Sequence, residues 1–67
     1  MTHASIPRVF AEITAKLEDL HAVAVEGQRR DNAPDMQIVL SAHLLTGLAS
    51  LDGTVRTMSM TLEGDRS

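Results

Sequence analysis

The sequence predicts an all-α protein: two long helices folded into an antiparallel hairpin, which we expect to dimerise into a four-helix bundle. Apolar residues recur at spacings of three and four along two long stretches, as on one face of a helix. A short segment containing asparagine, proline and aspartate separates the two stretches. The chain has 67 residues and no cysteine, so a hairpin alone has a small core and no disulfide to stabilise it. Association with another copy is therefore the expected source of stability.

The first helix is predicted at about residues 6–29 of this single domain. Ser5 is a favourable N-cap, and Pro7 falls in the first turn, where the missing N–H of proline is not needed. We expect the helix to end between Gly27 and Arg30, because arginines in a last turn complement the helix dipole. The heptad-like apolar stripe of this helix consists of Ile6, Phe10, Ile13, Leu17, Leu20 and Ala24.

The second helix is predicted at about residues 34–63, after a turn at about residues 30–33. Asn32 is its predicted N-cap and Pro34 lies in its first turn. The connection is so short that the helices are expected to be antiparallel neighbours. Gly47 and Gly53 inside the helix indicate close packing or local flexibility, and Gly53 is a candidate break point. The main stripe of this helix consists of Met36, Leu40, Leu44, Leu48, Leu51, Val55, Met58 and Leu62.

A second apolar ridge, which includes Ile38 and Leu45, lies off the main stripe of the second helix. A helix that is apolar nearly all round is normally covered on more than one side. We therefore regard Ile38 and Leu45 as a candidate face for a separate protein partner. The predicted self-association core consists of Ile6, Phe10, Ile13, Leu17, Leu20, Leu40, Leu44, Leu48, Leu51, Val55, Met58 and Leu62.

Charge and hydropathy favour a cytoplasmic protein that does not contact a membrane. The net charge is −3, with nine acidic and six basic side chains, which disfavours a nucleic-acid backbone as partner. The longest uncharged stretch, residues 36–51, is shorter than the roughly 20 apolar residues of a spanning helix. The N-terminus lacks the basic start and apolar run of a signal peptide.

Three residues are candidate metal ligands. Glu18 and His21 have the Glu-x-x-His spacing that di-iron carboxylate bundles use to place two ligands on one helix face. If the centre of the hairpin is near residue 32, His43 lies across from His21. Leu17 and Leu20 occupy the predicted seam, so the candidate ligands are expected at its edge. The sequence thus predicts no bound metal or cofactor, and keeps these three residues as candidates.

Arginines form the other candidate site. Arg29 and Arg30, with Arg8 or Arg56, would make a phosphate-binding patch if they came together, although nearby acidic residues oppose it. In shape, such a hairpin dimer is similar to Rop, a two-helix dimer that binds RNA, but no residue pattern supports the analogy.

The sequence predicts a non-enzymatic protein–protein interaction module, such as a small adaptor, assembly or regulatory subunit. The hydroxyl residues have no base and orienting group beside them in the pattern, so an enzyme is not expected. The expected partners are a second copy and, through Ile38 and Leu45, another protein. The alternatives are a metal-binding, ferritin-like mini-bundle and a Rop-like dimer that binds nucleic acid.

Overall fold

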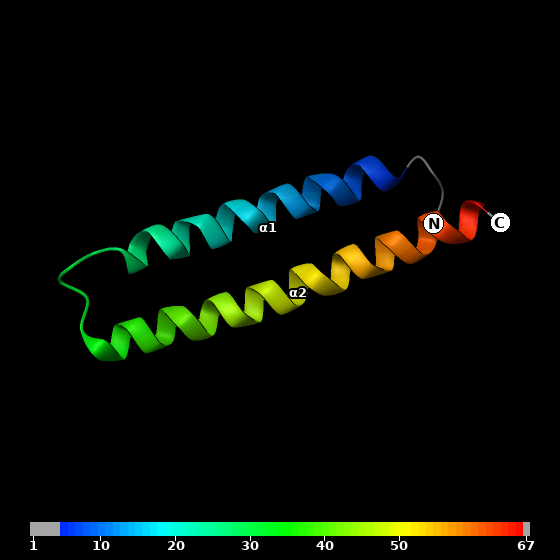
Figure 1. The fold of residues 1–67 in the computed structure, drawn as a ribbon. Coiled ribbons are helices and arrows are strands. Elements are labelled where there is room, and N and C mark those ends of the chain that lie inside the picture. The colour runs from blue at the N-terminus through cyan, green and yellow to red at the C-terminus, as the bar shows by residue number, and fades with distance from the viewer. Residues whose placement is uncertain (1–4, 67) are drawn as a thin grey trace.

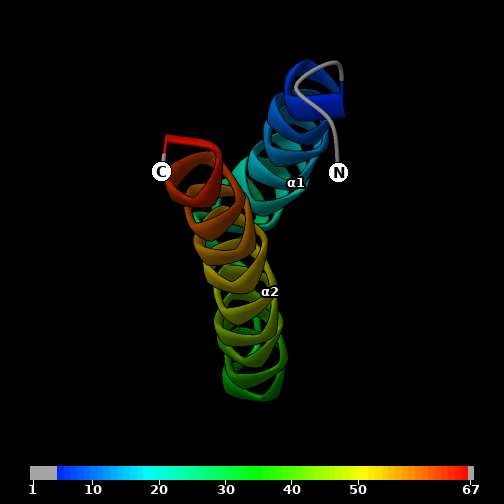
Figure 2. The same ribbon diagram turned by 90° about the vertical axis from the view of Figure 1, so that its right-hand side faces the viewer.

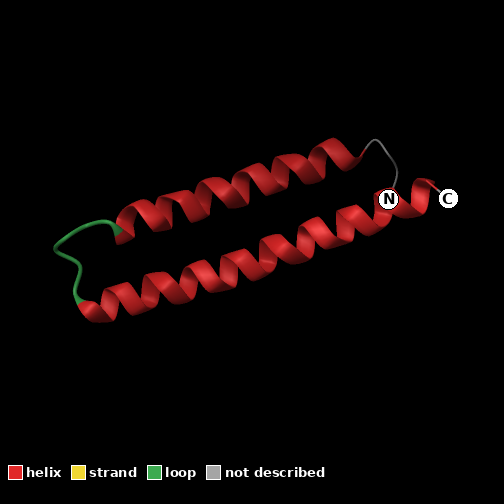
Figure 3. Cartoon of the chain, viewed as in Figure 1, coloured by secondary structure: helices red, strands yellow, loops and turns green. Residues whose placement is uncertain are grey.

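The structure, a computed structural model that describes residues 5–66, is a hairpin of two helices (Figure 1). Helix α1 spans Ile6–Gly27 and helix α2 spans Pro34–Arg66. Figure 3 shows the two helices antiparallel and joined by one loop. The predicted all-α hairpin is confirmed, and its dimerisation stays a prediction.

Helix α1 has 22 residues, with Ser5 at its N-cap position and a proline in its first turn. It ends at Gly27, the first residue of the range 27–30 in which we expected its end. The amide of Gln28 donates to the carbonyl of Val25 at 3.0 Å, and the amide of Arg29 donates to that of Glu26 at 3.2 Å. These bonds between residues three apart tighten the last turn and satisfy carbonyls that the helix leaves open.

Asn32 caps the end of α1 and not the start of α2. Its Nδ2 donates to the carbonyl oxygen of Glu26 at 2.8 Å. Helix α2 begins at Pro34, and the amide of Gln37 donates to the carbonyl of Ala33 at 3.0 Å. The predicted N-cap role of Asn32 is therefore wrong, because its side chain turns back to the Glu26 carbonyl in the last turn of the preceding helix.

Helix α2 has 33 residues and runs to Arg66, three residues past its predicted end. It continues through Gly53 without a break. Figure 2, turned by 90° from Figure 1, shows that the axes of α1 and α2 are inclined to each other. The hairpin is a rod whose longest extent is 52 Å.

The two helices meet along a seam of side chains that neighbouring residues cover at least partly. Three of the described side chains are buried: Ile6, Val9 and Met58, which lie at the open end of the hairpin with Ile13 and Leu62 packed on them. Toward the turn, the seam is only partly covered. The seam consists of Ile6, Val9, Ile13, Lys16, Leu20 and Val23 on α1 and Leu40, Leu44, Gly47, Leu51, Thr54, Met58 and Thr61 on α2.

Gly47 lets the two helices approach each other closely. A Cβ placed on Gly47 would overlap Cδ2 of Leu20 and would lie 3.3 Å from its Cγ. A Cβ on Gly53 would meet nothing within 4 Å. Close packing therefore explains the glycine at position 47, whereas nothing in the structure explains the one at position 53.

Candidate functional site

The predicted self-association core lies partly in the seam and partly outside it. In the hairpin, Ile6 and Met58 are buried, and six further members are partly covered: Ile13, Leu20, Leu40, Leu44, Leu51 and Leu62. The other four are exposed: Phe10, Leu17, Leu48 and Val55. A single hairpin therefore leaves a third of this predicted core open.

The four exposed members belong to two columns, one on each helix, which also contain the exposed residues Ala24 and Ser41 and the partly covered Leu62. On α1, Phe10, Leu17 and Ala24 each come one residue after a seam residue, at intervals of seven that keep them in one column. On α2, Ser41, Leu48, Val55 and Leu62 follow the seam in the same way. We call these two columns together the apolar face.

Two shallow grooves show that these columns lie on one side of the hairpin. A groove of about 350 Å³ near the turn is lined from both helices, with Ala24 of α1 and Ser41 of α2 among its walls. A groove of about 470 Å³ near the open end is lined instead by Glu12 of α1 and by Ser50 and Thr57 of α2. These residues precede the seam, so the second groove opens on the opposite, polar face.

The apolar face is half exposed along most of its length. The exposed fraction is 52% for Phe10, 50% for Leu17, 53% for Leu48 and 39% for Val55. Single exposed apolar side chains are ordinary on protein surfaces, but a continuous column on two adjacent helices is typical of a surface that another molecule covers.

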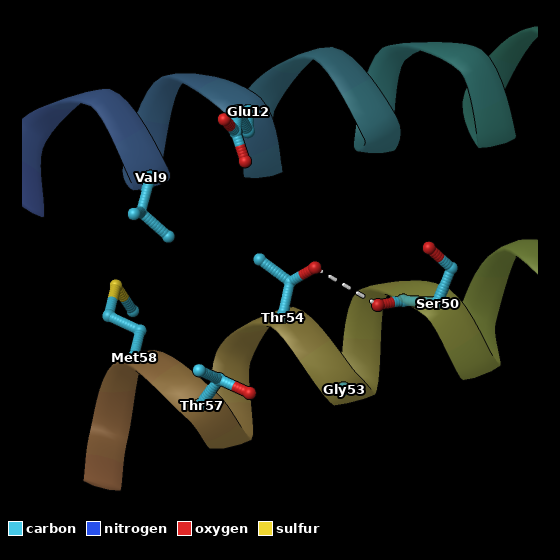
Figure 4. A pocket seen from close by; sticks show the side chains of 7 residues that line it. All are labelled: Val9, Glu12, Ser50, Gly53, Thr54, Thr57 and Met58. Carbon is cyan, nitrogen blue, oxygen red and sulfur yellow. Dashed lines mark hydrogen bonds between the residues drawn. The ribbon is translucent and has the colours of Figure 1, made fainter. Parts of the chain in front are cut away.

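The polar face carries hydroxyl and carboxylate groups (Figure 4). Val9 and Met58 point toward each other across the seam, and Glu12 extends from α1 toward α2. The hydroxyl of Thr54 donates to the carbonyl of Ser50 at 3.1 Å, which satisfies it within its own helix. The groove is open to solvent along its length, so it is a hollow between helices and not an enclosed binding cavity.

Lys16 is a seam residue that the stripe predicted from the sequence omits. Its Nζ donates to Oγ of Ser50 on the other helix at 3.2 Å. Lysine can lay its apolar stem along a seam while its ammonium group reaches polar partners at the edge. The signal is in the sequence, because Lys16 continues the spacing of Val9, Ile13 and Leu20.

The candidate partner ridge lies next to the apolar face. Ile38 is 66% exposed and Leu45 is 71% exposed. Leu45 is three residues before Leu48 and four after Ser41, which makes it a surface neighbour of both on a helix. The ridge therefore extends the apolar face sideways near the turn.

The hairpin does not bring the three candidate metal ligands together. Glu18 and His21 line a shallow hollow on α1 with Leu17, beside the apolar face. His43 directly precedes the seam residue Leu44, which places it on the polar face. Because Leu20 faces Gly47, the position opposite His21 is near residue 46, about one helical turn from His43. Within residues 5–66, no group of three or more His, Asp or Glu side chains is placed to hold a metal ion.

The arginines are divided between the two ends of the hairpin. At the turn, Arg29 pairs with Glu26 at 3.1 Å and with Asp31 at 2.9 Å. The hydrogen bond to Asp31 and then the charge of Glu26 raise the pKa of Arg29 above its usual value. Far along α2, Nε of Arg56 lies 2.7 Å from the carboxylate of Asp52. These two arginines are thus matched by acidic neighbours and do not form one basic patch.

Among residues 5–66, one helical segment is long and apolar enough to cross a membrane: Pro34–Gly64 of α2. A single such helix is weak support for a span, since apolar helices of soluble bundles have the same length and composition. In the hairpin, α1 lies along α2 and carries Glu12, Glu18 and Asp19, whose charges are costly at membrane depth. A spanning α2 would therefore have to separate from α1, and the cytoplasmic location stays a prediction.

No protein-family model, curated protein or solved structure matches this chain. What the protein does must therefore be inferred from the hairpin itself.

Proposed function

We propose that the chain is a non-enzymatic protein–protein interaction module that works as a homodimer, in which two hairpins form a four-helix bundle. Its cellular role would be that of a small adaptor, assembly or regulatory subunit. The observation that carries the proposal is the apolar face, which continues the seam outward on both helices and is half exposed in a single hairpin.

The small core of the hairpin supports association. Three buried side chains at one end are few for an ordered domain, and domains of this size without disulfides are commonly stabilised by oligomerisation. A helix of a four-helix bundle buries a stripe wider than a two-helix seam, because it contacts two neighbours. The stripe here has that width: it includes the seam and the column beside it.

Light scattering over a wide range of protein concentrations, combined with far-UV circular dichroism, tests the proposal. We expect a mass of two chains at high concentration and loss of helix on dilution in step with loss of the dimer, because folding and association are linked. A helical monomer that unfolds cooperatively with a midpoint independent of concentration would contradict it.

A further inference from the structure

The apolar face has its large and small residues at opposite ends. Phe10 and Val55 are toward the open end of the hairpin, and Ala24 and Ser41 are toward the turn. Leu17 and Leu48 lie between them, seven residues from each. The single aromatic side chain of the protein therefore projects from one end of a face whose other end holds only small side chains.

The small end is also hollow. The groove of about 350 Å³ lies there, and it is walled by Val23, Ala24, Gly27, Gln28, Gln37, Leu40, Ser41 and Leu44. No wall residue is charged, and the groove lies on the same side of the hairpin as Phe10 because Ala24 and Ser41 belong to the apolar face. The face thus carries a projecting ring toward one end and a groove toward the other. Each lies about two helical turns from Leu17, in the middle of the face.

We propose that Phe10 of one copy fills the groove between Ala24 and Ser41 of a second copy, with the two hairpins antiparallel. This inference rests on the homodimer proposed above. A two-fold axis beside Leu17 and Leu48 exchanges the two ends of the face. The Phe10 ring of each copy therefore enters the groove of the other copy. Such an interface is self-complementary, as two-fold interfaces must be.

The exposed area fits a second copy. The chain exposes 5227 Å², whereas a compact monomer of its 7.2 kDa exposes about 4,100 Å². The excess of about 1,100 Å² per chain would correspond to about 2,200 Å² buried in total, within the range of obligate homodimers.

The charges of the face also favour a like partner. Two acidic residues lie beside the apolar face: Glu18 on α1, and Asp52 on α2, which pairs with Arg56 at 2.7 Å. Glu12, Asp19 and Glu26 lie on the opposite, polar face. Three of the four acidic residues of α1 therefore lie away from a second copy, and Asp52 is paired within its own helix, so little net charge opposes contact between two apolar faces.

Cysteine cross-linking tests the seating of Phe10 directly, because the natural chain has no cysteine. In one hairpin, Phe10 lies near Val55, and Ser41 is fourteen residues along α2, roughly 21 Å away. A disulfide needs Cα atoms about 4.4–6.8 Å apart, so a Phe10→Cys/Ser41→Cys variant cannot close within one chain. We expect mild oxidation to give a covalent dimer of this double variant, and little of it from either single variant. A dimer linked through Phe10→Cys alone, with none gained from the pair, would mean parallel hairpins and overturn the proposal.

Filling the groove gives a second, independent test. Ala24→Leu should raise the dimer dissociation constant about tenfold or more, since the new side chain occupies the space for Phe10. The matched control is Ala22→Leu, two residues away on the polar side of α1, which should leave the dissociation constant unchanged. Phe10→Ala should weaken the dimer similarly, and the Phe10→Ala/Ala24→Leu pair should recover part of the loss.

The outcomes separate this inference from the proposed function. If wild type is a dimer, Ala24→Leu leaves its dissociation constant unchanged and the cysteine pair does not cross-link, then the module dimerises through another surface. If wild type is a helical monomer at every concentration, both proposals are wrong. Because the cysteine pair leaves the seam intact, its result stands even if a groove-filling variant folds poorly.

Discussion

The contact between Gly47 and Leu20 makes a quantitative prediction about two glycines of the same helix. Replacing an exposed helical glycine by alanine stabilises a helix by about 0.5–1 kcal/mol. Gly53→Ala should raise the free energy of unfolding by that amount, because a Cβ there meets nothing within 4 Å. At Gly47 the new methyl group overlaps Leu20 Cδ2, and moving that side chain from its rotamer and contacts should cost about 1–2 kcal/mol. We therefore expect Gly47→Ala to have a free energy of unfolding about 1–2 kcal/mol below that of Gly53→Ala.

Urea denaturation followed by far-UV circular dichroism measures this difference. All variants are compared at one protein concentration, because association contributes to the apparent stability. In thermal unfolding, a difference of 1 kcal/mol corresponds to about 4–8 °C in Tm for a domain of this size.

A double-mutant cycle with Leu20→Ala assigns the cost to its cause. Without the leucine side chain, Gly47→Ala should give the full stabilisation of about 0.5–1 kcal/mol. If Gly47→Ala stabilises the wild-type protein as much as Gly53→Ala does, then Leu20 does not lie over Gly47, and the close approach of the two helices at this position is wrong.

Three further predictions concern single features of the hairpin. Lys16→Leu should raise the urea midpoint, by about 1 kcal/mol in the free energy of unfolding, because an apolar side chain fills the seam in place of a solvated hydrogen bond to Ser50; a lower midpoint would show that the polar contact is needed. Asn32→Ala should lower the free energy of unfolding by about 1 kcal/mol through loss of the hydrogen bond to the Glu26 carbonyl. Asn32→Asp, which lacks the donor, should lose stability in the same melting experiment, whereas full retention in both variants would refute the capping role. Adding Zn²⁺ or Fe²⁺ to protein purified without a tag should leave Tm unchanged, and a rise in Tm that His21→Ala abolishes would contradict this.

The hairpin could be predicted from the sequence because its signals are local. Spacings of three and four, Pro7 and Pro34 in first turns, and a short connection each act within one or two helical turns. Asn32 shows the limit of such reasoning. The same side chain suits the end of one helix and the start of the next, and only the folded turn shows which backbone group it reaches.

The rotation of the helices about their axes could not be predicted from the stripe. Val9, Phe10 and Ile13 all fit an apolar column, and the spacing does not state which pair of columns faces the other helix. The structure places Val9 in the seam and Phe10 beside it. A stripe three columns wide contains columns that face the other helix and a column that stays exposed. Which column has which role depends on how the neighbouring helix packs.

Both described ends of the chain, residues 5 and 66, lie at the same pole of the rod, opposite the turn (Figure 1). In an antiparallel pair of hairpins, the two copies would therefore hold whatever is joined to their ends at opposite poles, separated by a length close to the 52 Å of one rod. Fluorophores on the two chains would report that separation as weak energy transfer, and a tandem fusion of two copies would need a linker of about 15 extended residues. Such a dimer would both link two attached groups and hold them at a fixed separation.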